Sequence, residues 1–188
     1  MSMKKNKKVY VSLISDMLHA GHINILNEAA RHGEVTVGLL TSYAVTELND
    51  TVYLKYKQRE ELLKSISMVS SVIPQDEASY KNNLKKLKPD FVVHGDDWVD
   101  NDHNCYRKEV LDLLSEWGGQ LIEIPYSSDI SDKDFKKQLM RSGVTSVTRQ
   151  QRLRQLIKLK PVVKILEVHS ALSGLIAENT VLQINCNL

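Results

Sequence analysis

The sequence predicts an α/β domain, a doubly wound parallel sheet over residues 1–142, followed by a C-terminal helical extension over residues 143–188. Three observations lead to this prediction. Short apolar, β-branched runs alternate with amphipathic segments, which is the pattern of repeated strand–helix–strand units. The 188 residues suffice for one domain with its own core. Polar stretches follow three of the expected strands, at the edge where such sheets bind ligands.

The first three elements form a parallel βαβ unit. Residues 9–14 are an apolar run long enough for one buried strand. A helix with apolar residues at helical spacing follows as far as Arg31, and Gly33 is its stop signal. Residues 34–40 are rich in β-branched and apolar side chains and form the second strand. At this spacing the crossover is expected to be right-handed.

The remaining segments repeat this alternation. Residues 41–53 have no clean period, so we expect a loop there. Residues 55–66 are helical, with Leu62 predicted to face inward and Arg59 outward. The further expected elements are a strand at 71–74, a helix at 80–87, strands at 91–94 and 121–125, a helix at 106–117 between those two strands, and a helix that starts at Ser131.

Composition excludes several functional classes. The chain carries 25 Lys and Arg against 23 Asp and Glu, a net charge of +2, so no nucleic-acid partner is expected. Cys105 and Cys186 are far apart and lack metal-ligand spacing, which fits a reducing cytoplasm and no metal centre. No apolar run has transmembrane length, and Asp16 and His19 interrupt the signal-like start. We therefore expect a cytoplasmic protein without a membrane partner.

The most informative stretch follows the first strand. Ser15 and Asp16 end that strand, and His19-Ala20-Gly21-His22 opens the helix. The first N–H groups of a helix lack intrahelical partners and carry partial positive charge, so a phosphate is their natural ligand. Histidines three apart share a helix face and can donate hydrogen bonds to phosphoryl oxygens. A solvated helix cap is the alternative that the residues alone leave open.

Two further polar stretches converge on the same edge of the sheet, namely residues 95–98 and 126–131. Together with residues 15–22 they predict one nucleotide-sized crevice. In Gly95-Asp96-Asp97-Trp98 the glycine permits close backbone approach, a carboxylate can accept from an amino group, and the indole can form a wall. A turn built on two aspartates is the alternative.

These motifs resemble those of a known superfamily. His19-Ala20-Gly21-His22 is similar to the HxGH signature of the nucleotidyltransferases, and residues 95–98 resemble the GDDW segment of their cytidylyltransferase branch, which includes the glycerol-3-phosphate cytidylyltransferases. The resemblance implies a Rossmann-like nucleotidyltransferase fold, CTP as substrate, Mg²⁺ that comes with CTP, no protein metal site, and an assembly that is often a homodimer. It implies catalytic roles for His19, His22 and Arg59, and nucleotide binding by Ser15, Asp16, Gly21, Gly95, Asp96, Asp97, Trp98, Ile130 and Ser131.

The resemblance gives each residue a role. Asp97 is expected to accept a hydrogen bond from the cytosine amino group, and Arg59 to hold the nucleotide phosphates through its forked donors. From the residues alone, Arg59 could instead pair with Glu60 or Glu61 on the surface of its helix. His19 and His22 are expected to stabilise the transition state of phosphoryl transfer.

One segment departs from the family pattern. Ile130 and Ser131 match the end of a family signature, but Tyr126, Asp129 and Asp132 replace its arginine, glycine and threonine. Two carboxylates close to a triphosphate repel it. This favours, as an alternative, a catalytically weak nucleotide-binding module of a phosphonate or surface-polysaccharide pathway. An adenylyltransferase shares the HxGH signature, although Gly95-Asp96-Asp97-Trp98 argues against it.

The C-terminal part has a resemblance of its own. Residues 160–178 resemble the opening of phosphoenolpyruvate mutase, which makes the carbon–phosphorus bond of phosphonates. This implies that residues 143–188 comprise a linker helix and the truncated start of a second domain. We therefore expect an enzyme that joins CMP from CTP to a small phosphonate, or to a phosphate monoester of the choline, ethanolamine or glycerol kind, and releases pyrophosphate.

Overall fold

The computed structural model describes residues 7–48, 52–98 and 104–125, together with the isolated positions 154, 157, 158, 169, 170 and 173. The predicted domain boundary at 142/143 and the predicted helix at Ser131 lie outside the described residues, as does the mutase-like segment apart from positions 169, 170 and 173.

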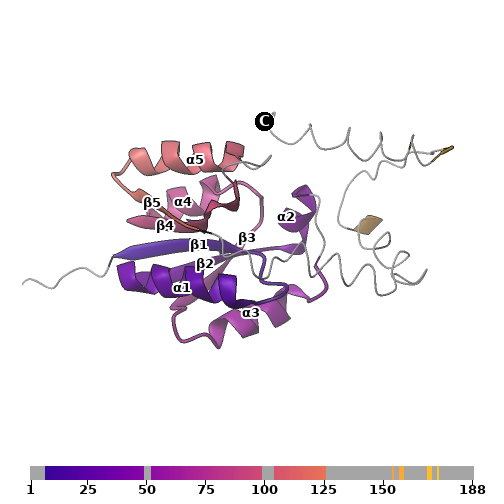
Figure 1. The fold of residues 1–188 in the computed structure, drawn as a ribbon, viewed down its shortest axis with the longest axis horizontal. Coiled ribbons are helices and arrows are strands. Elements are labelled where there is room, and N and C mark those ends of the chain that lie inside the picture. The colour runs from indigo at the N-terminus through magenta and orange to yellow at the C-terminus, as the bar shows by residue number, and fades with distance from the viewer. Residues whose placement is uncertain are drawn as a thin grey trace, which may run out of the picture.

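A five-stranded parallel sheet forms the centre of the described domain (Figure 1). Its strands are β1 Lys8–Leu13, β2 Glu34–Leu40, β3 Ser71–Gln75, β4 Phe91–Gly95 and β5 Gln120–Ile124, in the order β3-β2-β1-β4-β5. The chain builds outward from β1 to β3, then returns to pair β4 with the other side of β1. The strand order therefore reverses between β1 and β4, which is the position where doubly wound sheets bind ligands.

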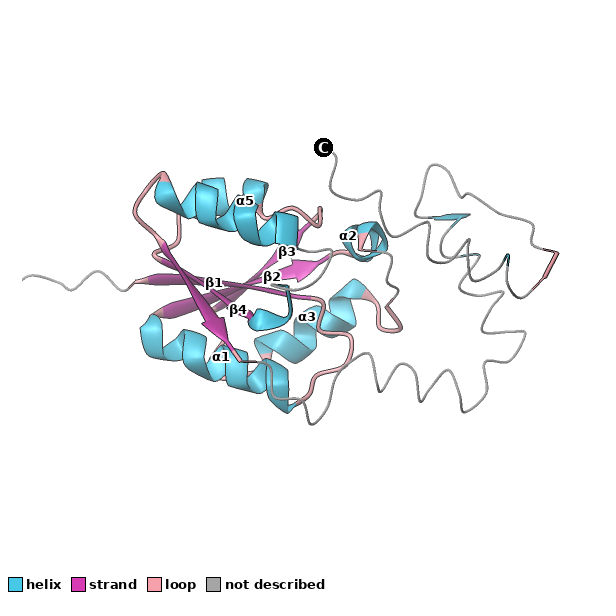
Figure 2. Ribbon diagram, turned by 45° about the horizontal axis from the view of Figure 1, so that its top comes forward, coloured by secondary structure: helices cyan, strands magenta, loops and turns pink. Residues whose placement is uncertain are grey.

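Helices cover both faces of the sheet and confirm the doubly wound prediction. Figure 1 shows α1 and α3 on one face and α4 and α5 on the other, and Figure 2 shows α1 and α3 opposite α5. The helices are α1 Ala20–His32, α2 Ser42–Glu47, α3 Tyr56–Lys64, α4 Lys81–Leu87, α5 Asn104–Ser115 and the 3₁₀ turn η1 Asp96–Trp98. Within the described ranges, no helix has the length and apolarity needed to cross a membrane.

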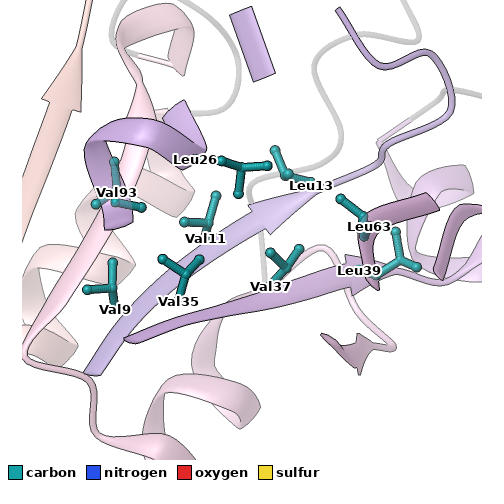
Figure 3. Packing of buried hydrophobic residues seen from close by; sticks show 10 residues of the cluster. Val9, Val11, Leu13, Leu26, Val35, Val37, Leu39, Leu63 and Val93 are labelled. Atoms are coloured by element: carbon teal, nitrogen blue, oxygen red, sulfur yellow. The ribbon is translucent and has the colours of Figure 1, made fainter. Parts of the chain in front are cut away.

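Central strands are buried on both faces because their alternate side chains point into two different clusters. Val9, Val11 and Leu13 of β1 pack toward α1 and α3 (Figure 3). Tyr10 points the other way, into the cluster beneath α4 and α5. This double burial explains why β1 appears in the sequence as a continuous apolar run. The first cluster consists of Val9, Val11, Leu13, Leu26, Ala29, Val35, Val37, Leu39, Leu63 and Val93.

A buried polar network fixes β3 against β1 across the intervening strand β2. The side-chain Oε1 of Gln75 accepts from the Tyr10 hydroxyl at 2.7 Å and from Ser12 Oγ at 2.9 Å. A Cβ at Gly38 of β2 would overlap the Tyr10 hydroxyl, so only glycine lets the tyrosine cross. Burial raises the pKa of Tyr10 well above its ordinary value, and the hydroxyl therefore stays a donor.

The predicted loop at 41–53 is wrong for residues 42–47, which form α2. Thr41 caps this helix, since its Oγ1 accepts from the N–H of Ala44 at 3.3 Å. Ala44 and Val45 are fully buried against the end of β2. A helix of six residues is too short to establish a 3.6-residue period, which explains why the pattern did not reveal it.

The predicted facing of α3 is also wrong in two positions. Arg59 is fully buried, whereas Leu62 is 45% exposed. The surface pairing of Arg59 with Glu60 or Glu61 is therefore excluded. Hydropathy placed the cation outside, but main-chain carbonyls at the sheet edge need donors, and the guanidinium supplies them.

Candidate active site

His19 caps the helix that leaves the central strand. Its backbone is extended, with φ −138° and ψ 174°, and its Nδ1 accepts from the N–H of Gly21 at 3.0 Å. In return, the N–H of His19 donates to Nδ1 of His22 at 3.4 Å. The two ring centroids lie 4.1 Å apart. The structure thus brings both predicted histidines together at the N-terminus of α1, where no acidic side chain occupies the first turn.

Gly21 is required by this cap. A Cβ at that position would lie 2.8 Å from Cε1 and 3.0 Å from Nδ1 of His19, closer than side-chain contacts allow. Any larger residue would therefore displace the imidazole that folds back over it. The glycine between the two histidines serves the placement of the His19 ring rather than an unusual backbone angle.

The cap also fixes the tautomers of the two imidazoles. Because Nδ1 of each ring accepts a backbone N–H, the neutral ring carries its proton on Nε2. Burial, with a further contribution from His19, lowers the pKa of His22 to about 4. At neutral pH His22 is therefore an uncharged donor.

Asp16 anchors the segment that leads into α3. Its carboxylate is buried and accepts from the N–H groups of Tyr53 at 2.9 Å and Leu54 at 2.8 Å. The turn after β1 and the segment after α2 are thereby held together. These backbone donors already engage both oxygens of the carboxylate. A nucleotide contact of Asp16 stays a prediction.

Arg59 of α3 contacts the turn after β1 and the end of β2. Its Nη1 donates to the carbonyl of Ile14 at 2.6 Å and to that of Leu40 at 2.8 Å, and its Nε donates to Leu54 at 3.3 Å. Burial lowers the pKa of the guanidinium, and the charge of Asp16 opposes that shift. Main-chain carbonyls thus engage Nε and Nη1 of this fully buried side chain, and the phosphate-holding role of Arg59 stays a prediction.

Among the described residues near this turn, Ser15 Oγ, Tyr56 Oη and Arg59 Nη2 are buried without a hydrogen-bond partner. Ser15 also has a φ of +54°, which a residue with a side chain adopts at a cost. Strained backbone and unsatisfied polar atoms concentrate at functional sites. Ser15 therefore remains a candidate nucleotide-binding residue.

The second predicted stretch lies beyond β4, across the switch point from the histidines. Gly95 ends that strand, and Asp96, Asp97 and Trp98 form η1. The Trp98 side chain is only 2% exposed, and its ring stacks on His94 with centroids 3.8 Å apart and planes at 12°. Trp98 thus contributes packing instead of an open pocket wall. The side chain of Asp97 is outside the described part of the structure, so its contact with cytosine stays a prediction.

Sequence reasoning missed three residues beside η1. Trp98 Nε1 donates to Oε1 of Glu123 on β5 at 2.8 Å, and Arg107 of α5 forms two hydrogen bonds of 2.8 Å with the same carboxylate. His94 completes the group through its stack with the indole. A glutamate within the apolar strand Gln120–Ile124 was the available signal. The predicted residues Ile130 and Ser131, and the departures at 126–132, lie outside the described residues.

The described residues show no group of three or more His, Cys, Asp or Glu side chains placed to hold a metal ion. This holds only for residues 7–48, 52–98 and 104–125 and the isolated positions. The absence of a protein metal site stays a prediction.

Comparisons with known proteins agree with this architecture. The glycerol-3-phosphate cytidylyltransferase of Bacillus spizizenii is 30% identical over 135 residues, which cover 71% of this chain and 97% of that protein. The D-beta-D-heptose 1-phosphate adenylyltransferase of Bordetella bronchiseptica is 28% identical over 127 residues, covering 65% of this chain and 75% of that protein. Of another relative, the bifunctional protein HldE of Hydrogenovibrio crunogenus, the chain spans only about a fifth.

Fold similarity extends to solved structures. The crystal structure of the lipopolysaccharide core biosynthesis protein from Thermoplasma volcanium superposes with a TM-score of 0.54 at 20% identity, covering 65% of this chain and 98% of that one. Residues 15–138 match the cytidylyltransferase-like family over a range that includes both the histidine cap and η1. The mutase-like resemblance of residues 160–178 lies outside this range and stays a prediction. The resemblance of the first domain to the nucleotidyltransferases is confirmed, and the chain belongs to the cytidylyltransferase-like family.

Proposed function

We propose that the chain is a CTP-dependent cytidylyltransferase that joins CMP to a small phosphonate or phosphate monoester and releases pyrophosphate. The observation that carries this proposal is the reciprocal cap of His19 and His22 at the start of α1. It lies at the carboxyl end of the central strand, beside the point where the strand order reverses. A triphosphate bound there would meet backbone N–H groups, the positive end of the helix dipole and two imidazoles.

The chemistry needs positioning and charge stabilisation instead of a covalent enzyme intermediate. An oxygen of the acceptor's phosphoryl group attacks the α-phosphorus of CTP in line. The bond between that phosphorus and the oxygen bridging to the β-phosphate breaks, and pyrophosphate departs with the electron pair. The Nε2–H groups of His19 and His22 would donate to the phosphoryl oxygens, whose negative charge grows along this path.

The nucleotide preference rests on two supports. Residues 95–98 resemble the cytidylyltransferase segment, and the relative that the chain covers almost completely is named for cytidylyl transfer. A second relative is named for adenylyl transfer, so ATP belongs in every assay as a competitor. The acceptor class rests on two separate observations. The name of the first relative supports a phosphate monoester, whereas the phosphonate rests on the mutase-like residues 160–178.

Magnesium is proposed to come with CTP. The described residues offer no ready-made cluster of metal ligands, so the ion would be held mainly by the triphosphate oxygens. Bound there, it would neutralise part of the charge of the phosphates. No step above is assigned to the ion.

We also propose a cytoplasmic location and leave the homodimer as an expectation from the family.

The test is pyrophosphate release from CTP, with ATP in parallel, in the presence of magnesium and one acceptor at a time. The acceptors are 2-aminoethylphosphonate, 2-hydroxyethylphosphonate, phosphocholine, phosphoethanolamine and glycerol 3-phosphate. Turnover with CTP and one acceptor supports the proposal and identifies the substrate. CTP binding without turnover would favour the weak nucleotide-binding module, and turnover with ATP alone would overturn the choice of nucleotide.

The matched variant is His19→Asn. Asparagine is a good N-cap residue, so α1 should keep its start while the imidazole is lost. His32→Asn, at the other end of the same helix, is the control for loss of a histidine as such. The proposal expects turnover to fall only for His19→Asn, with both variants retaining cooperative unfolding.

A further inference from the structure

Glu123 joins three elements at the carboxyl edge of the sheet. Its Oε1 accepts from Trp98 Nε1 of η1 and from Nε of Arg107 on α5, and its Oε2 accepts from Nη2 of the same arginine. All three distances are 2.8 Å. The arginine–carboxylate contact is therefore bidentate, which fixes orientation as well as distance.

This carboxylate occupies an unusual place for a charge. It lies within β5, one residue before the strand ends, and its side chain is 25% exposed, while that of Arg107 is 30% exposed. Arg107 is the main reason why the pKa of Glu123 lies below its usual value, with the Trp98 hydrogen bond adding to the shift. The group is thus held as a carboxylate, an acceptor of fixed direction for the indole N–H.

A second contact restrains the same indole from its face. His94 is paired with Glu123 in the β4–β5 register, and its ring stacks on Trp98 with a centroid separation of 3.8 Å. The Tyr80 ring lies against both, with its centroid 5.8 Å from that of Trp98 and 6.3 Å from that of His94. Trp98 is therefore held at its Nε1–H by the Glu123 carboxylate and at its ring face by the His94 imidazole. Since Trp98 ends η1, these contacts fix one end of the turn that contains Asp97.

We propose that Glu123 is a positioning residue which, through Trp98 and with Arg107, sets the turn 96–98 for recognition of a 4-aminopyrimidine nucleotide. This inference rests on the proposed function and adds residues that the sequence motifs did not single out. A base-reading carboxylate discriminates only when its oxygens are held to a fraction of an ångström. An untethered turn would still bind a triphosphate through α1 but would lose its preference for the amino group.

The test compares CTP with UTP, in which a carbonyl replaces the 4-amino group. Glu123→Gln keeps an acceptor for the indole but loses the ion pair. It is expected to raise KM for CTP and to lower the CTP/UTP ratio of kcat/KM by about tenfold, with kcat at saturating CTP nearly unchanged. The matched control is Glu60→Gln, which breaks the exposed ion pair of Glu60 with Lys64 far from η1. Glu60→Gln should leave the KM for CTP and the CTP/UTP ratio of kcat/KM unchanged.

A double-mutant cycle separates positioning from a general effect on the fold. Trp98→Phe removes the indole N–H that donates a hydrogen bond to Glu123. If Glu123 acts through Trp98, adding Glu123→Gln to Trp98→Phe should change the CTP/UTP ratio little further. Independent, multiplying effects would overturn the proposed route. Should Glu123→Gln fail to fold, Arg107→Gln breaks the ion pair alone and is expected to shift the ratio in the same direction by a smaller factor.

A readout without turnover distinguishes the two proposals. In a Trp117→Phe background Trp98 is the remaining tryptophan, because the chain has two. The fluorescence emission of Trp98 and its quenching by acrylamide should change on Glu123→Gln. CTP should change this emission more than UTP does. If the wild type binds neither nucleotide, the proposed function fails and the base-selection role fails with it. If the wild type binds CTP and Glu123→Gln has an unchanged ratio and unchanged emission, only the inference is overturned.

Discussion

Nη1 of Arg59 lies 2.6 Å from the carbonyl oxygen of Ile14 and 2.8 Å from that of Leu40, so one buried cation joins the carboxyl ends of β1 and β2. The turn that leads to the histidine cap begins at Ile14. Asp16, two residues further on, accepts from the backbone that precedes α3. Arg59 and Asp16 thereby lock α3 and the turn after β1 into one unit.

Arg59→Lys should therefore destabilise the whole domain. A single ammonium cannot supply the three hydrogen bonds of the guanidinium in their observed directions. Hydrogen bonds to charged groups contribute roughly 1.5–3 kcal/mol each, so a loss of about 3 kcal/mol in the free energy of unfolding is expected. Urea denaturation followed by circular dichroism measures it.

The control for Arg59→Lys is Lys57→Met on the exposed side of the same helix, which should shift the urea midpoint little. If Arg59 held phosphate instead, Arg59→Lys would keep the stability of the wild type and raise KM for CTP. That result would contradict the positioning role.

The strand–helix alternation was predictable because each central strand is apolar on both faces and each long helix has one apolar stripe. The exceptions have local causes. α2 is too short to show a period, and its start is marked only by Thr41. Arg59 was placed on the wrong side because hydropathy does not record that the carbonyls of Ile14 and Leu40 accept hydrogen bonds from it once the sheet has formed.

The candidate site was predictable where one motif holds all its parts. His19, Gly21 and His22 contact one another within a single turn, so their spacing encodes the cap. The Glu123–Trp98 contact joins residues 25 positions apart. No local spacing reveals such a pair, and only the β4–β5 register brings it together.

Ser15→Ala is expected to stabilise the fold while weakening nucleotide binding. The hydroxyl of Ser15 is buried without a partner among the described residues, and an unsatisfied buried polar group costs about 1–3 kcal/mol. Its removal should raise the free energy of unfolding by about 1 kcal/mol, because the strained backbone angle remains. If the hydroxyl meets CTP, calorimetry should show a higher Kd.

Ser12→Ala is the matched comparison, since Ser12 is a buried serine of the preceding strand whose Oγ donates to Gln75 at 2.9 Å. This variant should lose stability instead of gaining it. Equal destabilisation by both substitutions would show that Ser15 Oγ has a partner in solution.

Gly21→Ala should separate activity from stability. The new Cβ would push the His19 ring out of its cap, which costs about 1 kcal/mol, while alanine returns a similar amount through helix propensity. Displacing the imidazole should lower kcat by on the order of tenfold to a hundredfold. Asn27→Ala, exposed on the same helix, should alter neither rate nor melting temperature appreciably. Unchanged turnover in Gly21→Ala would argue against a catalytic His19 ring.

His22 should make the stability of the domain depend on pH between about 4 and 6.5. Burial and the neighbouring His19 lower its pKa from 6.5 to about 4, so in this window the unfolded chain binds a proton that the folded chain does not. Protonation then favours unfolding. The contribution of His22 is complete above pH 6.5 and is lost as the pH falls toward 4.

His22→Gln keeps an acceptor for the His19 N–H, as a capping box requires, and removes the titration. Urea titrations at several pH values should give a flatter curve for the variant than for the wild type, and parallel curves would show that the imidazole is not buried in solution.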